Sequence, residues 1–179
     1  MATINFSYFY RNTEIPQLGT EKTVQNEVQA FIDQYETEYL EGLMGYAFKK
    51  LYDAGITATD QIYLDIKNGK EYTNLANIQL KWKGLVRTTP VASPIANYIY
   101  FKYMQYHASF STGSGGKVIN APSTVHVGDT DKMVLAWNEM VESNWQFRDF
   151  IMSNRDIYPD FKDTVYCNEL FKKLNVLGI

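Results

Sequence analysis

The first strong pattern along the chain is helical. Between residues 20 and 51, apolar side chains recur at spacings of three and four positions, which places them on one face of an α-helix. Thr20 and Thr23 are both suitable N-caps for the first turn. The stretch 36–38 is a candidate break that would divide the segment into two helices. The apolar stripe of the first half consists of Val24, Val28, Phe31, Ile32, Tyr35 and Tyr39.

Two glycines interrupt the second half of this helical segment. Gly42 and Gly45 flank Leu43–Met44, and each glycine in a helix costs roughly 1 kcal/mol relative to alanine. A helix tolerates that cost where another part of the chain comes close to its backbone, so we expect a close approach here. The stretch 53–55, which ends in glycine, then stops the segment.

A short helix and a hairpin follow. Thr59 is placed to cap a helix that passes through Ile66 and ends at Asn68–Gly69. Residues 71–73 and 78–82 then alternate polar and apolar side chains and are separated by a polar turn. Alternation with a period of two is typical of strands, so these two stretches predict a small β-hairpin.

The next helix is unusually aromatic. Ser93 is a good N-cap and Pro94 fits the first turn, and the helix runs to His107. Apolar and aromatic side chains face nearly every direction around it, which is typical of a helix buried on most sides. It is too short and too polar to span a membrane, which needs about 20 apolar residues.

A long irregular stretch separates that helix from the last one. Residues 111–130 are rich in glycine, serine and threonine, and such a length of irregular chain inside a domain is uncommon and often functional. Its later part, 123–128, has the composition of a short strand. Asp129 or Thr130 then caps a helix to about residue 154. The broad apolar face of this helix consists of Met133, Trp137, Met140, Val141, Trp145, Phe150 and Ile151.

These elements predict a mainly α fold: a small helical bundle with a small β-hairpin or protruding loop and extended termini. Residues 1–20 form an extended N-terminal arm, because Pro16 disfavours helical angles at the residue before it. Residues 21–154 form the helical domain with its long loop at 111–128, and residues 155–179 form a C-terminal tail. We expect the aromatic arm to pack either on its own domain or on a neighbouring molecule.

Composition narrows the function classes. The chain has 179 residues, 45% of them hydrophobic, which is enough for one domain with a real core. Its net charge of −3 argues against a nucleic-acid binder that relies on a basic surface. The charge still allows a protein that surrounds DNA without gripping it. The 14 tyrosines and 10 phenylalanines fit an aromatic core and a protein–protein contact equally well.

The residues that usually carry catalysis or bind metals are sparse. His107 and His126 form no metal-ligand spacing with the single cysteine, Cys167, which also has no partner for a disulfide. The glycine-rich stretch 111–118 lacks the first glycine of a phosphate-binding loop and has Val118 where serine or threonine would bind magnesium. We expect no catalytic residue, cofactor or metal. An enzyme built around Cys167 or His107 is a further hypothesis, beside the two binding roles described below.

The N-terminal residues lack the basic region and apolar run of a signal peptide. We therefore expect a protein that is made and used in a cytoplasm, or that is carried in a particle assembled there. Several segments then occur in a distinctive order along the chain. They are Glu38-Tyr39-Leu40-Glu41-Gly42-Leu43-Met44-Gly45-Tyr46, Asn68-Gly69-Lys70-Glu71-Tyr72, Trp82-Lys83-Gly84-Leu85, Ser93 to Tyr103, Ala136-Trp137-Asn138-Glu139-Met140-Val141, and Asn175 to Ile179. In this order they resemble the head-to-tail connector proteins of tailed bacteriophages, especially the neck or ring proteins of crAss-like and other phages of gut Bacteroidales.

The resemblance extends from about residue 20 to the end and rests on packing motifs. It implies a structural virion protein, not an enzyme, that forms a ring, usually dodecameric, in the head–tail neck. The implied partners are further copies of the chain, the portal protein and the next neck or tail protein. Double-stranded DNA would pass through the lumen without specific binding, and no membrane is involved. Assembly would take place in the cytoplasm of the bacterial host.

A ring subunit makes a heterologous contact, in which two different surfaces of one chain complement each other. The arm, the long loop and the tail are the expected material for such contacts. A non-viral helical adaptor that binds other proteins as a monomer is the alternative. The candidate contact residues for subunits and partners are Tyr8, Phe9, Tyr10, Gly113, Gly115, Lys117, Val125, Val127, Leu177 and Ile179.

Overall fold

The computed structural model describes residues 3–108, 111–112, 115–116, 127–163 and 168–175. Helices dominate it, so the expected mainly α fold with a small β-hairpin is confirmed. The α-helices are α1 (Lys22–Met44), α2 (Tyr46–Thr57), α3 (Gln61–Asn68), α4 (Pro94–Ala108) and α5 (Val127–Ser153). The antiparallel strand pairs are β1 (Lys70–Thr73) with β2 (Gln79–Trp82), β3 (Arg87–Thr88) with β4 (Val91–Ala92), and β5 (Ser111–Thr112) with β6 (Gly115–Gly116). Short 3-10 helices are η1 (Phe6–Tyr8), η2 (Arg11–Thr13) and η4 (Glu169–Phe171).

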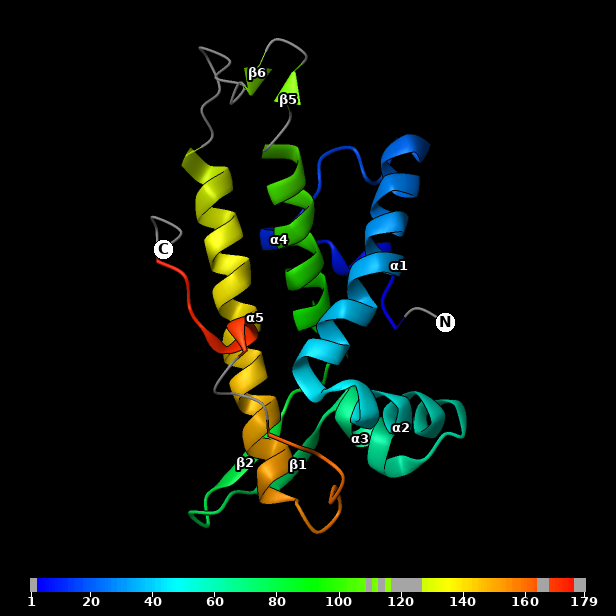
Figure 1. Ribbon diagram of the computed structural model, residues 1–179, viewed down its shortest axis with the longest axis vertical. Helices are drawn as coiled ribbons and strands as arrows, with labels where there is room; N and C mark the ends of the chain where they lie inside the picture. Colours follow the sequence, from blue (N-terminus) through cyan, green and yellow to red (C-terminus); the bar gives the residue numbers. More distant parts are fainter. Residues whose placement is uncertain (1–2, 109–110, 113–114, 117–126, 164–167, 176–179) are drawn as a thin grey trace.

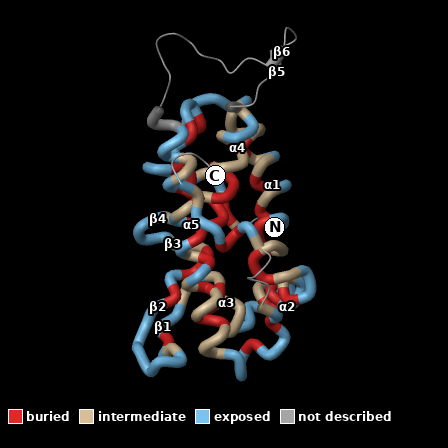
Figure 2. The backbone as a smooth tube through the Cα atoms, turned by 60° about the vertical axis from the view of Figure 1, so that its left-hand side comes forward, coloured by how far each residue is buried: buried red, intermediate tan, exposed pale blue. Residues whose placement is uncertain are grey.

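Helices α1, α4 and α5 stand side by side along the long axis of the molecule, with α4 in the middle (Figure 1). Helices α2 and α3 and the hairpin β1–β2 lie at one end of this body, and strands β5 and β6 lie beyond its other end. Buried residues line the inner sides of the helices and continue toward α3 and the hairpin (Figure 2). The body is therefore elongated, with different structures at its two ends.

The break between α1 and α2 lies at Gly45, not at the predicted stretch 36–38. Gly45 has a φ of 77°, in the region that favours glycine. Glu36 remains helical, and its carboxylate accepts hydrogen bonds from the backbone N–H groups of Thr3 (2.7 Å) and Ile4 (3.3 Å). Helix α2 also continues through the predicted stop at 53–55. The turn at Gly45 directs α2 away from α1 at the lower end of the body (Figure 1).

The close approach expected near the glycines is found at Gly42. A Cβ atom added there would lie 2.8 Å from Cδ1 of Leu170, and the side-chain amide of Asn168 donates to the Gly42 carbonyl. Leu170 is buried and belongs to the C-terminal segment. Gly42 therefore makes room for that segment, whereas Gly45 is required by its backbone conformation.

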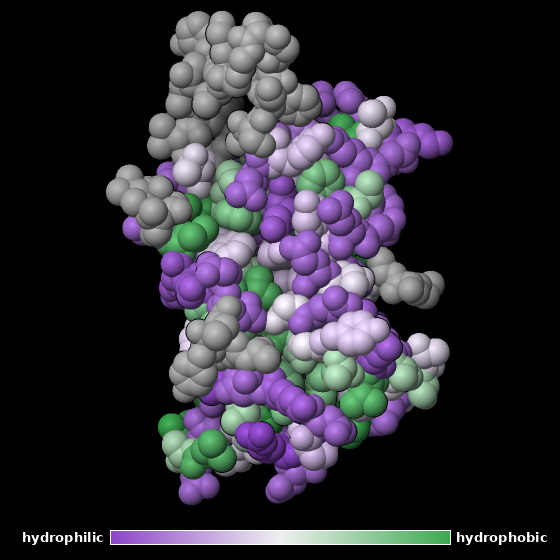
Figure 3. Space-filling view, viewed as in Figure 1, coloured by the Kyte–Doolittle hydropathy of each residue, from purple (hydrophilic) through white to green (hydrophobic). Residues whose placement is uncertain are grey.

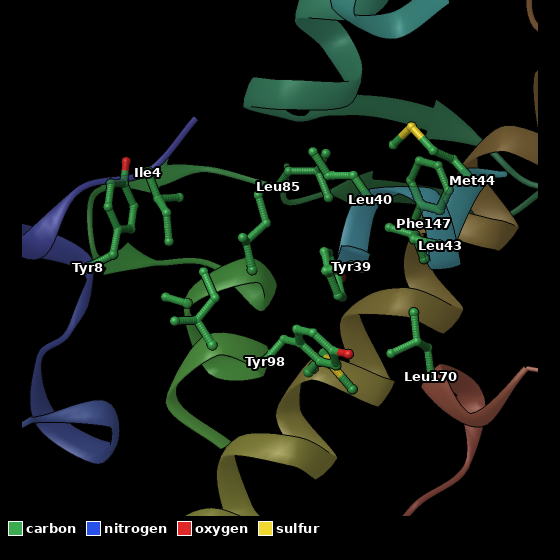
Figure 4. Close-up of a cluster of buried hydrophobic side chains, with 14 of the residues drawn as sticks. Ile4, Tyr8, Tyr39, Leu40, Leu43, Met44, Leu85, Tyr98, Phe147 and Leu170 are labelled. Carbon is green, nitrogen blue, oxygen red and sulfur yellow. The ribbon is translucent and has the colours of Figure 1, made fainter. Parts of the chain in front are cut away.

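Helix α4 forms the centre of the core. Ser93 caps it as predicted, since its hydroxyl oxygen accepts from the N–H of Ile95 (3.2 Å) and its O–H donates to the Leu85 carbonyl (2.7 Å). Tyr98 lies close to Tyr39 of α1 (Figure 4), with 5.4 Å between the ring centroids. The buried residues of α4 are Pro94, Ile95, Ala96, Tyr98, Ile99, Tyr100 and Tyr103. A large share of the aromatic content therefore serves the core.

Three helix starts differ from the expected ones. Glu21 occupies the N-cap position of α1 and makes no side-chain cap hydrogen bond, so neither Thr20 nor Thr23 caps that helix. Asp60, not Thr59, caps α3, with its carboxylate accepting from the N–H of Ile62 (3.3 Å). Thr59 has a φ of 57°, whereas an N-cap residue is normally extended. Helix α5 begins at Val127, so residues 127–128 are helical and do not form the expected strand.

The N-terminal segment folds onto its own helical body. Its two 3-10 turns, η1 and η2, follow the point where Glu36 of α1 holds the backbone of Thr3 and Ile4. Ile4 and Tyr8 lie in the same buried cluster as Leu85 (Figure 4). The buried apolar side chains of this segment are Ile4, Tyr8, Phe9, Ile15 and Leu18. Of the two placements expected for the arm, the structure has the one on its own domain.

Residues 168–175 lie along α5. The indole N–H of Trp137 donates to the carbonyl of Lys172 (2.8 Å). Deeper in the core, the Tyr39 hydroxyl donates to the Asn144 side-chain oxygen, and the Asn144 amide donates to the Leu170 carbonyl (2.7 Å). Asn144 is fully buried, so this polar network joins α1, α5 and the C-terminal segment in one structure.

Candidate interaction surfaces

The hairpin β1–β2 is firmly attached to the body. In its antiparallel register Lys70 faces Trp82 and Tyr72 faces Leu80. Both aromatic side chains are buried. The indole N–H of Trp82 donates to the Ile66 carbonyl of α3 (2.8 Å), and the Tyr72 hydroxyl donates to Asp149 of α5. The base of the hairpin is therefore fixed to two helices.

The turn of this hairpin is held by its own hydrogen bonds. The side-chain oxygen of Asn74 accepts from the N–H groups of Ala76 (3.0 Å) and Ile78 (2.9 Å). The backbone of Asn74 also bonds to Ile78 and to Asn77. Asn77 has a φ of 61°, a conformation that asparagine tolerates better than most residues. The turn therefore has a defined shape without help from the rest of the chain.

This turn presents apolar side chains to solvent. Leu75 is 80% exposed, Ile78 55% and Leu80 39%; we call these three residues the hairpin patch. Figure 3 shows apolar atoms at this tip, at the lower left of the view. Single exposed apolar residues are ordinary, but a group on a rigid projection is typical of a contact surface.

A groove of about 640 Å³ lies between α1 and α2; we call it the α1–α2 groove. Thr3 of the N-terminal segment also belongs to its lining. Its apolar lining includes Ile32 and Leu40 of α1 and Ile56 of α2. The turn at Gly45 sets the two helices apart and so creates this groove.

Tyr52 lines the α1–α2 groove with an unsatisfied hydroxyl. The side chain is 2% exposed, and its hydroxyl has no hydrogen-bond partner among the described residues. Burial raises the pKa of this phenol well above its ordinary value, and the nearby carboxylates of Glu36 and Asp53 raise it further. The hydroxyl therefore stays protonated as a donor. A buried polar group without a partner is costly, so Tyr52 is suited to meet an acceptor from outside this chain.

The rim of the same groove is acidic. Three carboxylates, Asp33, Glu36 and Asp53, stand against one ammonium group, that of Lys49. Lys49 pairs with Asp53 at 2.7 Å, and Glu36 holds the N-terminal backbone. Asp33 is exposed and accepts a hydrogen bond only from a neutral amide among the described contacts, that of Gln29 (2.8 Å). The groove is therefore a partly apolar depression with excess negative charge.

The contact residues expected in the N-terminal segment divide into two kinds. Tyr8 and Phe9 are buried in the core, so they are not available at the surface of the folded chain. Their aromatic rings fill the space beside the helical body, which is why the segment folds back. Tyr10 is 59% exposed and remains accessible.

The other expected contact residues belong to the loop and the C-terminus. Val127 is the first residue of α5 and Gly115 lies in β6. Strands β5 and β6 stand beyond the ends of α4 and α5, far from the hairpin β1–β2 (Figures 1 and 2). The expected contact residues that lie outside the described residues are Gly113, Lys117, Val125, Leu177 and Ile179.

Of the two histidines and the cysteine considered as catalytic or metal-binding residues, only His107 lies within the described residues. His107 has its Nε2 atom 3.2 Å from Oε1 of Glu27, at the surface of α4 and α1. Cys167 and His126 lie outside the described residues. Within the part of the chain that the structure describes, no group of three histidine, cysteine or acidic residues is arranged to hold a metal. No helix in those ranges combines the length and apolar character needed to cross a membrane.

The hairpin patch and the α1–α2 groove were not found by sequence reasoning. The stretch 74–78 has the composition of a polar turn, because Asn74 and Asn77 flank its apolar residues. The apolar residues inside the turn, Leu75 and Ile78, were the available clue. The groove has no local pattern at all, since it depends on the angle between two helices.

No protein-family model, curated protein or solved structure matches this chain.

Proposed function

We propose that this chain is a structural virion protein that forms a ring between the portal and the tail of a tailed bacteriophage. In this role it is a head-to-tail connector that extends the DNA channel. One observation carries the proposal: a rigid apolar projection stands on one side of the body and α2, which lines a partly apolar, acidic groove, lies on the other. The groove also holds a buried donor, the Tyr52 hydroxyl, without a partner among the described residues. Unlike surfaces of this kind favour head-to-tail association between copies.

The placement of the two surfaces bears on the symmetry of the assembly. The hairpin lies on one side of the lower half of the molecule, and helix α2, which lines the groove, lies on the other side (Figure 1). A two-fold dimer would need both contacts to form between the same two copies, which opposite placement disfavours. Repetition of one heterologous contact gives a ring when the rotation closes.

The order of packing motifs supports the phage assignment. The segments on which the resemblance rests contribute core residues, including Leu43, Met44, Trp82, Leu85 and Tyr98. The resemblance therefore concerns the helical scaffold. A ring whose lumen passes DNA has to avoid strong phosphate binding, and a chain with a net charge of −3 suits that requirement.

The α1–α2 groove also favours a second candidate, a helical adaptor that binds a basic, apolar segment of another protein. The two candidates differ in the expected occupant of the groove. The connector fills it on assembly with further copies, whereas the adaptor remains a monomer until its partner arrives.

The proposed function is tested by light scattering of the purified protein, alone and mixed with the portal protein from the same genome. A ring mass, or a shift of the portal peak to larger mass, supports the connector. A monomer that leaves the portal peak unchanged contradicts it and favours the adaptor. Leu135→Asp is the control for variants that place aspartate on the hairpin patch, because Leu135 is an exposed apolar residue of α5 outside both surfaces.

A Cys167→Ser variant separates both candidates from an enzyme. Both binding roles predict that the variant folds, assembles or binds as the original chain does. Loss of function with an unchanged melting temperature would instead indicate that the thiol has a chemical role.

A further inference from the structure

We infer that the hairpin patch of one copy docks into the α1–α2 groove of the next copy. This inference rests on the proposed function, because it names the contact that would build the ring. The occupant of the groove is thus a second copy of this chain, held by apolar burial, one hydrogen bond to Tyr52 and opposite charge.

The hairpin side of the contact is already organised for binding. The Asn74 side chain satisfies two backbone N–H groups of the turn, and Trp82 and Tyr72 attach the base of the hairpin to α3 and α5. Leu75 and Ile78 therefore lose little backbone freedom when a partner covers them, and preorganisation of this kind strengthens binding.

The groove side offers what such a hairpin needs. Ile56 is half-buried and offers apolar surface, and Ile32 and Leu40, both almost fully buried, lie beneath it. The Tyr52 hydroxyl is a protonated donor without a partner in the described chain. A hairpin turn brings backbone carbonyl oxygens to its tip, and a buried phenol donates well to such an acceptor. Docking would satisfy a buried hydroxyl of the groove that has no hydrogen-bond partner among the described residues.

The charges of the two surfaces are complementary. The hairpin and the residue after it carry three lysines, Lys70, Lys81 and Lys83, against one acid, Glu71. Lys70 is already paired with Asp65 of α3 (2.6 Å), so Lys81 and Lys83, both exposed, stand against Glu71 and leave a net charge of +1 for a partner. The groove has three carboxylates against Lys49, a net charge of −2. Complementary charges of this size set the orientation and the rate of docking more than its affinity.

Two variants test the contact from its two sides. Leu75→Asp with Ile78→Asp replaces the two most exposed residues of the hairpin patch and leaves the groove intact. Asp33→Lys with Asp53→Lys reverses the charge of the groove and leaves the hairpin intact. All four positions are exposed, so thermal melting followed by circular dichroism should show folded monomers for both variants.

The readout is sedimentation velocity, with portal rings added if the original chain assembles only on them. Each variant alone should need a concentration on the order of 30-fold higher for assembly. An equimolar mixture should instead form a one-to-one complex, because the groove of the hairpin variant still accepts the hairpin of the groove variant. The hairpin and the groove that remain unused in this pair are both the altered ones. No further copy can therefore add, and larger species should be missing.

A cross-link provides a positive test in a Cys167→Ser background. One copy carries Leu75→Cys and the other carries Thr37→Cys, since Thr37 is an exposed residue of the groove lining. Under mild oxidation the mixture should form a disulfide-linked pair. A Leu135→Cys copy in place of the Leu75→Cys copy should not.

The outcomes separate this inference from the proposed function. If the original chain assembles and both variants assemble equally well, the hairpin–groove contact is wrong while the connector role stands. A Leu75→Cys copy that cross-links to the portal and not to Thr37→Cys also overturns the contact. If the original chain assembles neither alone nor on the portal, both proposals fail together.

Discussion

Two short segments outside the long helices, the N-terminal segment 3–20 and the hairpin turn 74–78, differ in where they place their apolar side chains. The N-terminal segment buries its large apolar side chains against the helical body, with Phe9 only 6% exposed. The hairpin turn is equally well ordered by hydrogen bonds but leaves Leu75 and Ile78 in solvent. Order without burial is what distinguishes a contact surface from a part of the core.

This difference changes which part of the chain is assigned to assembly. The aromatic N-terminal segment attracts attention in the sequence because it is apolar and contains a proline. In the structure Glu36 holds its backbone and the core covers its side chains. The hairpin turn, with less apolar sequence, is the segment that has free apolar surface to offer.

The largest predicted effect separates folding from assembly. Phe9→Ala should lower the free energy of unfolding by about 3–5 kcal/mol, because a buried aromatic ring leaves a cavity. Leu75→Ala should change it by less than about 0.5 kcal/mol, because the side chain is exposed, while weakening assembly. Urea unfolding measures both effects. Equal destabilisation by the two variants would remove the contrast between the segments.

A smaller loss is expected when the N-terminal backbone is released. Glu36→Ala removes the acceptor for the N–H groups of Thr3 and Ile4, and loss of buried hydrogen bonds should cost about 1–3 kcal/mol. Hydrogen exchange should then increase at Thr3 and Ile4 without change in the hairpin. Thr37→Ala is the matched control, since Thr37 is the exposed neighbour on the same helix; a similar loss there would refute the anchoring role of Glu36.

The shape of the hairpin turn is tested by Asn74→Ala. The turn loses the acceptor that orders Ala76 and Ile78, so the free energy of unfolding should fall by about 1 kcal/mol. Assembly should weaken by up to about tenfold, because a looser turn loses more freedom on docking. Sedimentation velocity measures this change. Unchanged assembly would mean that the order of the turn does not contribute to binding.

The smallest effect is expected for Tyr52→Phe, and its sign differs between folding and assembly. The monomer should be as stable as before, or more stable by up to about 1 kcal/mol, because an unsatisfied buried hydroxyl is removed. Assembly should weaken about fivefold, the value of one hydrogen bond. A loss of monomer stability would show that the hydroxyl already has a partner in the single chain.

Local patterns predicted most of the secondary structure. The alternation in 71–73 and 78–82 predicted the hairpin, and Ser93–Pro94 predicted the start of α4. The helix break was assigned to 36–38, because three polar residues interrupt the apolar stripe there. A helix tolerates such residues when a distant partner pairs with one of them, and Glu36 pairs with the N-terminal backbone.

The interaction surfaces were much less predictable, for a physical reason. Burial of Tyr8 and Phe9 and exposure of Leu75 depend on which segment the tertiary structure covers, and neither follows from residue type. The α1–α2 groove depends on the angle that Gly45 sets between two helices. The sequence marks Gly45 as unusual, but only the structure links it to the cavity beside Tyr52.

The ring-forming role is tested most directly by native mass spectrometry of the portal mixed with an excess of this chain, beside the same mixture made with Leu75→Asp/Ile78→Asp. The original chain should add to the portal as a closed ring, dodecameric as in the connectors that it resembles. The double variant should add few or no copies. A portal that binds no copies, or a chain that forms only two-fold dimers, would contradict the claim that this protein is a ring-forming connector.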